Sequence, residues 1–61
     1  SDRERQLLLL EAAGCTAAEI ADALGGTGKS VQENQKDISR RLDIVNKSGA
    51  RIAKALQYGI I

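Results

Sequence analysis

The segment TAAEIADALGGTGKSV, residues 16–31, decides the fold that this sequence predicts. Thr16 with Glu19 three residues later has the spacing of a capping box, in which each side chain satisfies the other residue's free backbone N–H at a helix start. An apolar helical face follows from Ile20 onward, and Gly25 ends the helix. This helix has only about two and a half turns, so it is too short to persist alone and must pack between other elements.

The sequence on either side predicts two further helices. Ser1 and Glu4 form a second capping box, and Gly14 ends the first helix of the chain. Thr27 is the expected N-cap of a helix over residues 28–42. The apolar stripe of that helix consists of Val31, Ile38 and Leu42. Its other faces are polar, so we expect it to lie on the surface of the domain.

A fourth helix is expected at the end of the chain. Residues 43–47 form a break, Ser48 is the expected N-cap of a helix over residues 48–58, and Gly59 ends it. The candidates for burial in this helix are Ile52, Ala53, Leu56 and Tyr58. The sequence therefore predicts an all-α domain of four helices over residues 1–61. Two short helices joined by a tight glycine-containing turn and followed by a longer polar helix form the arrangement of a DNA-reading helix-turn-helix.

Length and composition restrict the function. A chain of 61 residues is one small domain, too short for an elaborate active site, so we expect no enzyme and no cofactor. Cys15 is the single cysteine, which excludes an internal disulfide and a cysteine-based zinc site, and we expect no metal. The longest apolar run, residues 7–10, cannot span a bilayer, and no signal-peptide pattern precedes it, so we expect a cytoplasmic protein without membrane contact.

Residues 23–30, ALGGTGKS, fit a relaxed phosphate-binding P-loop pattern with alanine in place of the first glycine. A P-loop needs a preceding strand and a parallel sheet to hold it. A capped helix precedes this segment instead. We therefore expect no nucleotide hydrolysis here.

The charge is distributed unevenly. The net charge is only +1, lower than is typical of DNA-binding domains. The first 28 residues carry two basic and five acidic side chains, whereas residues 29–61 carry seven basic and three acidic ones. The basic half predicts a surface that faces phosphates, and the acidic half could face solvent or a basic protein.

The sequence resembles the helix-turn-helix signature of LuxR-type regulators, the domain of NarL/FixJ response regulators and autoinducer receptors. The matching positions are Arg3-Glu4-Arg5, the apolar run ending in Gly14, Thr16-Ala17-Ala18-Glu19-Ile20-Ala21, Leu24, Ser30-Val31, Ile38, Leu42, Ile44, Asn46-Lys47, Ala50, Ala53 and Gly59-Ile60-Ile61. They run from one end of the chain to the other without a gap, which makes the match far more specific than a lone helix-turn-helix motif. The resemblance implies a four-helix domain at the C-terminal end of a longer regulator.

The resemblance also implies roles for individual residues. The third helix would enter the major groove of double-stranded DNA, and the fourth would form the contact of a homodimer. The base-facing positions fall on Gln32, Glu33 and Lys36. The positions facing the DNA backbone fall on Thr16, Ala17, Ser30, Arg40 and Lys47. The expected dimer contacts are Ile52, Leu56 and Ile60.

Four departures from the family pattern reduce the expected affinity for DNA or change the turn. Gln32 stands where the family commonly has lysine, and Asp37 stands where it commonly has asparagine. Asp37 and Glu33 thereby place two anions near phosphate. Asn34 replaces a common histidine. Gly26 replaces a bulky isoleucine or valine, and we expect a loose or unusually shaped turn there.

Two alternatives remain open. The helix-turn-helix could have lost DNA binding and could serve dimerisation or contact with RNA polymerase or another regulator, which the weak net charge favours. A promoter-reading fourth region of a sigma factor shares the same architecture. The match over residues 44–61 favours the LuxR type over the sigma factor.

Overall fold

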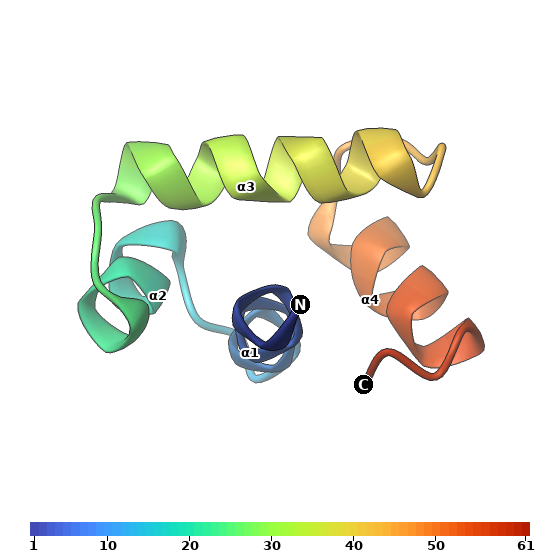
Figure 1. Ribbon diagram of the computed structural model, residues 1–61, viewed down its shortest axis with the longest axis horizontal. Helices are drawn as coiled ribbons and strands as arrows, with labels where there is room; N and C mark the ends of the chain where they lie inside the picture. The colour runs from blue at the N-terminus through green and yellow to red at the C-terminus, as the bar shows by residue number, and fades with distance from the viewer.

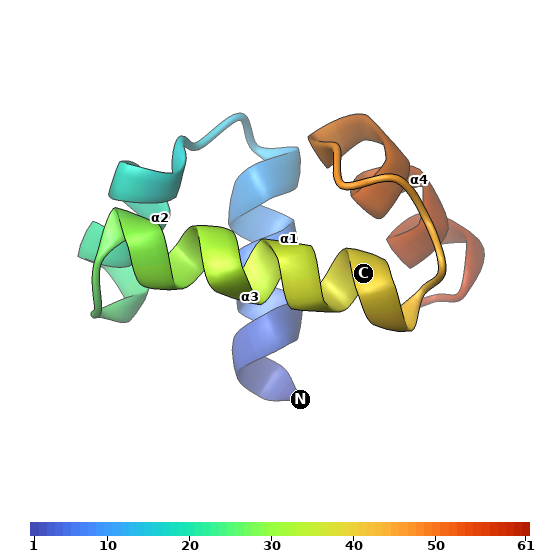
Figure 2. The same cartoon turned by 90° about the horizontal axis from the view of Figure 1, so that it is seen from above.

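The computed structural model describes all residues from 1 to 61 as four helices without a strand. The helices are α1 (Asp2–Ala12), α2 (Ala17–Leu24), α3 (Gly28–Arg41) and α4 (Ser48–Gln57). Figure 1 shows α3 lying across the other three, with α1 beneath it, α2 near its first turn and α4 near its last. The view from above in Figure 2 confirms that α1 and α3 cross. The predicted all-α fold is confirmed, and one side of α3 is left uncovered. None of the helices has the length and apolar character that crossing a bilayer demands.

The predicted capping boxes are present at the first two helices. At α2 the backbone N–H of Glu19 donates to the hydroxyl of Thr16 at 3.2 Å, and the N–H of Thr16 donates to the carboxylate of Glu19 at 2.8 Å. Ser1 and Glu4 form the same arrangement at α1. Thr27 caps α3 as predicted, with Ser30 as its partner. These helix starts follow from contacts that span only three residues.

The predicted cap of α4 is wrong. Ser48 is the first residue of the helix, and the N-cap is Lys47, whose side chain makes no capping hydrogen bond. The hydroxyl of Ser48 donates instead to the carboxylate of Glu11, 2.6 Å away. A long-range acceptor has therefore taken the hydroxyl that the sequence predicted for local capping.

The predicted burial along α4 is wrong at three of its four positions, because Ala53, Leu56 and Tyr58 are exposed, whereas Ile52 is half-buried. The buried residues of this helix are Arg51 and Ala55. Leu56 and Tyr58 are 61% and 57% exposed. The physical reason is an ion pair between Arg51 and the buried carboxylate of Glu11, which turns a charged position of α4 toward the core.

The core collects apolar side chains from all four helices. Its buried members are Leu7, Leu8, Ile20, Ala21, Val31, Ile38 and Ala55, with Leu42 and the C-terminal Ile60 and Ile61 packed against them. The predicted stripe of α3 thus faces inward. This packing fixes the orientation of α3, so that the remaining faces of the helix point away from the core.

The turn between α2 and α3 has an unusual shape, as predicted. Gly25 and Gly26 have φ values of +85° and +101°, a backbone region that favours glycine. A Cβ added at Gly26 would lie only 2.8 Å from the hydroxyl of Ser30. Arg3 reaches from α1 and donates to the carbonyls of Leu24 at 2.9 Å and Gly25 at 3.1 Å. It thereby satisfies carbonyl groups that the end of α2 leaves free.

The P-loop-like segment, residues 23–30, runs from the end of α2 into the first turn of α3. No strand precedes it, and the chain contains no sheet. The structural context that makes this motif a phosphate-binding loop is absent.

Candidate nucleic-acid interface

One face of α3 is exposed and polar. Val31 and Ile38 lie on the side of α3 that faces the core. Residues on the opposite side of the helix therefore point outward. Gln32, Glu33 and Lys36 are all exposed. None of the three takes part in a hydrogen bond or an ion pair within the protein, so their donors and acceptors are free for a ligand. We call these three residues the reading face.

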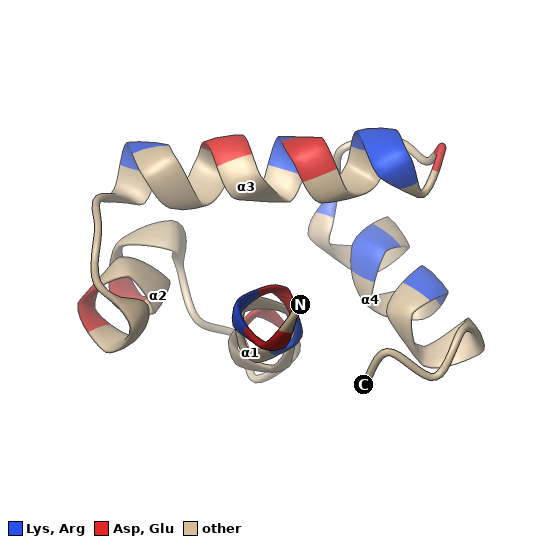
Figure 3. Ribbon diagram, in the orientation of Figure 1, with Lys and Arg blue, Asp and Glu red and all other residues tan.

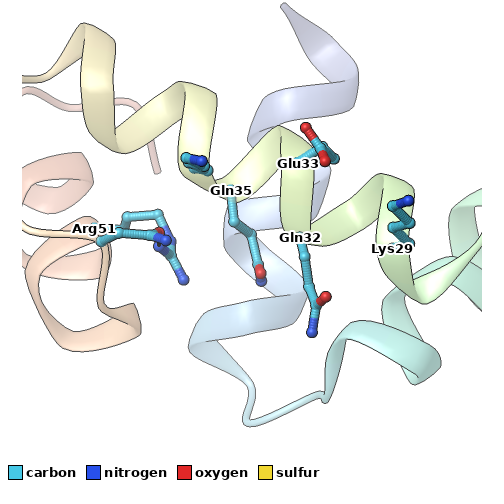
Figure 4. A pocket seen from close by; sticks show the side chains of 7 residues that line it. Lys29, Gln32, Glu33, Gln35 and Arg51 are labelled. Atoms are coloured by element: carbon cyan, nitrogen blue, oxygen red, sulfur yellow. Dashed lines mark hydrogen bonds between the residues drawn. The ribbon is translucent and has the colours of Figure 1, made fainter.

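A polar hollow of about 450 Å³ lies beside the reading face. It is lined by Lys29, Gln32, Glu33, Gln35, Lys36, Asn46 and Arg51, without a hydrophobic residue. In Figure 4, Gln32 and Gln35 extend to the same side of α3, and Arg51 approaches them from α4. The hollow therefore connects the reading face to the start of α4.

The predicted backbone-facing residues divide into two groups. Arg40 and Lys47 are exposed cations, and Lys47 has no partner in the protein, whereas Arg40 lies 3.5 Å from Asp37. Ala17 is the first residue of α2, and its side chain packs against the core. Its backbone N–H has no backbone acceptor. These groups can donate to phosphate oxygens.

The hydroxyl groups of the predicted set are already engaged. Thr16 accepts a hydrogen bond at the start of α2. The Ser30 hydroxyl donates to the carbonyl of Thr27 at 2.8 Å and accepts from the N–H of Thr27 at 3.0 Å. Their roles in DNA contact stay predictions, and the structure shows that both hydroxyls also cap helices.

The expected dimer residues do not form one exposed face. Leu56 is exposed, Ile52 is half-buried, and Ile60 packs against the core. On the last turn of α4, the ammonium of Lys54 lies 5.2 Å from the ring centre of Tyr58. Leu56 is therefore the member of the predicted set that is most available to a partner.

Charges of both signs alternate along the outward side of α3, as Figure 3 shows. Asp37 pairs with Arg40 and with Arg41, whose Nε lies 3.3 Å from the carboxylate, and Arg41 also pairs with Glu4 of α1. Arg51 is buried. The basic half of the sequence thus offers fewer free cations than its composition predicts. The lysines without a partner near this face are Lys29, Lys36 and Lys47.

A buried ion pair beneath the hollow was not predicted from the sequence. The side chains of Glu11 and Arg51 are only 2% and 5% exposed. Arg51 donates from Nε to one carboxylate oxygen at 3.0 Å and from Nη2 to the other at 2.6 Å. Gln35 and Ser48 donate to the second oxygen at 3.0 and 2.6 Å. One carboxylate of α1 therefore joins α3 to α4.

The guanidinium group of Arg51 makes further contacts. Its Nη1 donates to the hydroxyl of Ser39 at 3.1 Å and to the side-chain oxygen of Asn46. No buried side-chain nitrogen or oxygen in the protein lacks a hydrogen-bond partner. Such complete satisfaction is what makes a buried ion pair tolerable.

The pKa of Glu11 reflects this environment. Burial alone raises it, but the hydrogen bonds from Arg51 and Ser48 and the positive charge of Arg51 outweigh that effect and hold the pKa below its ordinary value. The sequence did contain a signal for this site. Glu11 lies three and four residues after Leu8 and Leu7, on the helical face that packs into the core.

The sequence is similar to that of a known transcriptional regulatory protein. Over 59 residues, 97% of the chain, the sequence is 37% identical to the transcriptional regulatory protein MctR of Rhizobium johnstonii. The chain spans 27% of the length of that protein. No protein-family model matches the chain. No solved structure matches it significantly.

Proposed function

We propose that this chain is a sequence-specific DNA-binding output domain of a bacterial transcription regulator of the LuxR type. The similarity to a transcriptional regulatory protein supports this proposal, and the similarity spans nearly the whole chain. The observation that carries it is the reading face of α3, where three polar side chains are exposed and unpaired. Such a domain acts in the cytoplasm, and the proposal assigns it no catalytic step and no cofactor.

The chemistry of the reading face suits base edges in the major groove. Gln32 can form two hydrogen bonds with adenine, Lys36 can donate to the O6 and N7 acceptors of guanine, and Glu33 can accept from the amino group of cytosine. An α-helix fits the width of the major groove, and the other three helices leave this side of α3 uncovered (Figure 1).

The groups around the reading face suit the phosphate backbone. Lys47 lies at the start of α4 with a free ammonium, and the N–H of Ala17 lies at the positive end of the α2 dipole. Arg40 can act as a third donor to phosphate once its ion pair with Asp37 is broken. Contacts of this kind fix the register of a protein on the duplex without specifying sequence.

The proposal includes a homodimer formed through α4. Leu56 is 61% exposed near the end of that helix, with Ile52 one turn before it. A two-fold symmetric dimer would bind a roughly palindromic site. Sedimentation of the chain with and without a palindromic duplex tests this part of the proposal.

Selection from a randomised duplex library, followed by fluorescence-anisotropy titrations at several salt concentrations, tests DNA binding. Lys36→Ala should weaken binding to the selected sequence by about 1–3 kcal/mol and should affect unrelated sequences much less. Lys47→Ala should weaken binding to all sequences and lower the slope of log affinity against log salt by about 1. Lys54→Ala is the matched control, because it removes the same charge from the last turn of α4. The absence of salt-dependent binding to any duplex would refute the proposal.

A protein-interaction module that contacts RNA polymerase or another regulator is the second candidate. The unpaired carboxylate of Glu33 on α3 favours it, because it repels phosphate, and Asp37 adds a second exposed carboxylate, which is paired with Arg40 and Arg41. An amide chemical-shift titration separates the two functions. Shifts confined to α1 and α2 on addition of a protein partner, with none on addition of DNA, would favour this second function.

A further inference from the structure

Lys47 lies between two residues that are anchored to the buried ion pair. Before it, the side-chain oxygen of Asn46 accepts a hydrogen bond from Nη1 of Arg51. After it, the hydroxyl of Ser48 donates to the carboxylate of Glu11 at 2.6 Å. Lys47 itself is exposed and has no partner. The backbone is thus held on both sides of a free cation.

The helix that carries the reading face is anchored to the same ion pair. Gln35 donates to the carboxylate of Glu11 at 3.0 Å, and Ser39 accepts from the guanidinium of Arg51 at 3.1 Å. These two residues of α3 are four apart, so they lie one above the other on one side of the helix. Asn46 and Gln35 also line the hollow that adjoins the reading face.

We infer that the Glu11–Arg51 pair is a positioning device, which holds Lys47 at a fixed place relative to the reading face so that phosphate and base contacts form together. This inference rests on the proposed DNA binding, because it requires Lys47 to contact a phosphate. The positioning residues themselves touch no DNA. They act through Asn46 and Ser48.

The physical reason is the cost of ordering on binding. A lysine on a mobile loop loses conformational freedom when it engages a phosphate, and this loss reduces the affinity gained from the contact. Hydrogen bonds to charged groups are roughly twice as strong as neutral ones, and burial strengthens them further. Two such bonds, one on each side of Lys47, order its backbone before DNA arrives.

A double-mutant cycle tests the inference with the 61-residue chain and the duplex selected above. Lys47→Ala is compared in the unchanged chain and in an Asn46→Ala/Ser48→Ala background. This background should fold, because the Glu11–Arg51 pair keeps both of its direct hydrogen bonds, the Gln35 bond and the Ser39 bond. Thermal unfolding checks this. Should the background unfold, Ser48→Ala alone carries the same test, since Glu11 then keeps three of its four hydrogen bonds.

In the unchanged chain, Lys47→Ala should lower the slope of log affinity against log salt by about 1. The loss of affinity that it causes should therefore be about eightfold larger at 0.1 M salt than at 1 M salt. In the Asn46→Ala/Ser48→Ala background, the slope should already be lower, and Lys47→Ala should change affinity less than about twofold. Gly49→Ala is the matched control. It alters the same helical turn without touching the anchors, and its added Cβ meets nothing within 4 Å.

The outcomes separate the two proposals. Equal effects of Lys47→Ala in both backgrounds would overturn the positioning role and would leave DNA binding intact. An unchanged salt slope in the Asn46→Ala/Ser48→Ala background would overturn it as well. Absence of salt-dependent duplex binding by the unchanged chain would instead remove the proposed function, and the positioning role with it.

Discussion

Replacing Glu11 by alanine should destabilise the domain by about 3–5 kcal/mol, the range for removing one partner of a buried ion pair. The carboxylate accepts four hydrogen bonds, two of them from Arg51. Its loss leaves Nε of Arg51 without an acceptor, and Nη2 with only the hydroxyl of Ser48 at 3.5 Å, in a position that is only 5% exposed. Ser48 and Gln35 are less buried and can turn to water, so most of the cost falls on the arginine.

This cost is large relative to the stability of a chain of this size. Domains have about 0.05–0.15 kcal/mol of stability per residue, which gives roughly 3–9 kcal/mol for 61 residues. Glu11→Ala should therefore leave the chain largely unfolded if its stability lies at the lower end of this range. At the upper end, the melting temperature should fall by roughly 12 °C or more. Urea and thermal unfolding followed by far-ultraviolet circular dichroism measure both quantities.

The double variant Glu11→Leu/Arg51→Met is the control that isolates the charge. It replaces both charges with apolar side chains of similar length, and such replacements are often neutral or stabilising by about 1–4 kcal/mol. A loss of less than about 1 kcal/mol in Glu11→Ala would refute the reasoning. A double variant as unstable as the single one would show that packing, and not the unpaired charge, sets the cost.

Two further predictions concern pH and the glycine turn. Because the folded-state pKa of Glu11 lies below its ordinary value of 4.5, the unfolded chain binds the proton first as the pH falls, and the free energy of unfolding should decrease below about pH 4.5. The free energy of unfolding of the Glu11→Leu/Arg51→Met variant should fall less steeply as the pH drops. Some acid dependence should remain because the backbone and hydroxyl of Thr16 also lower the pKa of Glu19. Urea unfolding at a series of acidic pH values measures this, and an equally steep loss of stability in both proteins would contradict the prediction. Gly26→Val should cost about 1–3 kcal/mol in urea unfolding, because its φ of +101° strains a branched side chain and its Cβ would lie 2.8 Å from the Ser30 hydroxyl. Gly49→Ala, which has open space and no positive φ, should cost nothing, and equal losses in the two variants would rule out strain as the cause.

The sequence by itself determined the four helices and the orientation of α3. A capping box involves residues three apart, and the core stripe of Val31 and Ile38 depends only on the helical period. The outward position of Gln32 and Lys36 follows from the same period, once Val31 faces inward. These features are local, so they can be predicted without knowledge of the distant parts of the chain.

Only the tertiary structure decided how α4 is turned and which charges remain free. Glu11 and Arg51 are 40 residues apart, and no pattern within either helix shows that they meet. Their pairing draws Ser48 away from capping and leaves Leu56 in solvent, which reverses what the apolar pattern of α4 predicts. The physical reason is that a buried charge requires a partner more strongly than an apolar side chain requires burial. Whether such a partner is within reach depends on how distant helices pack.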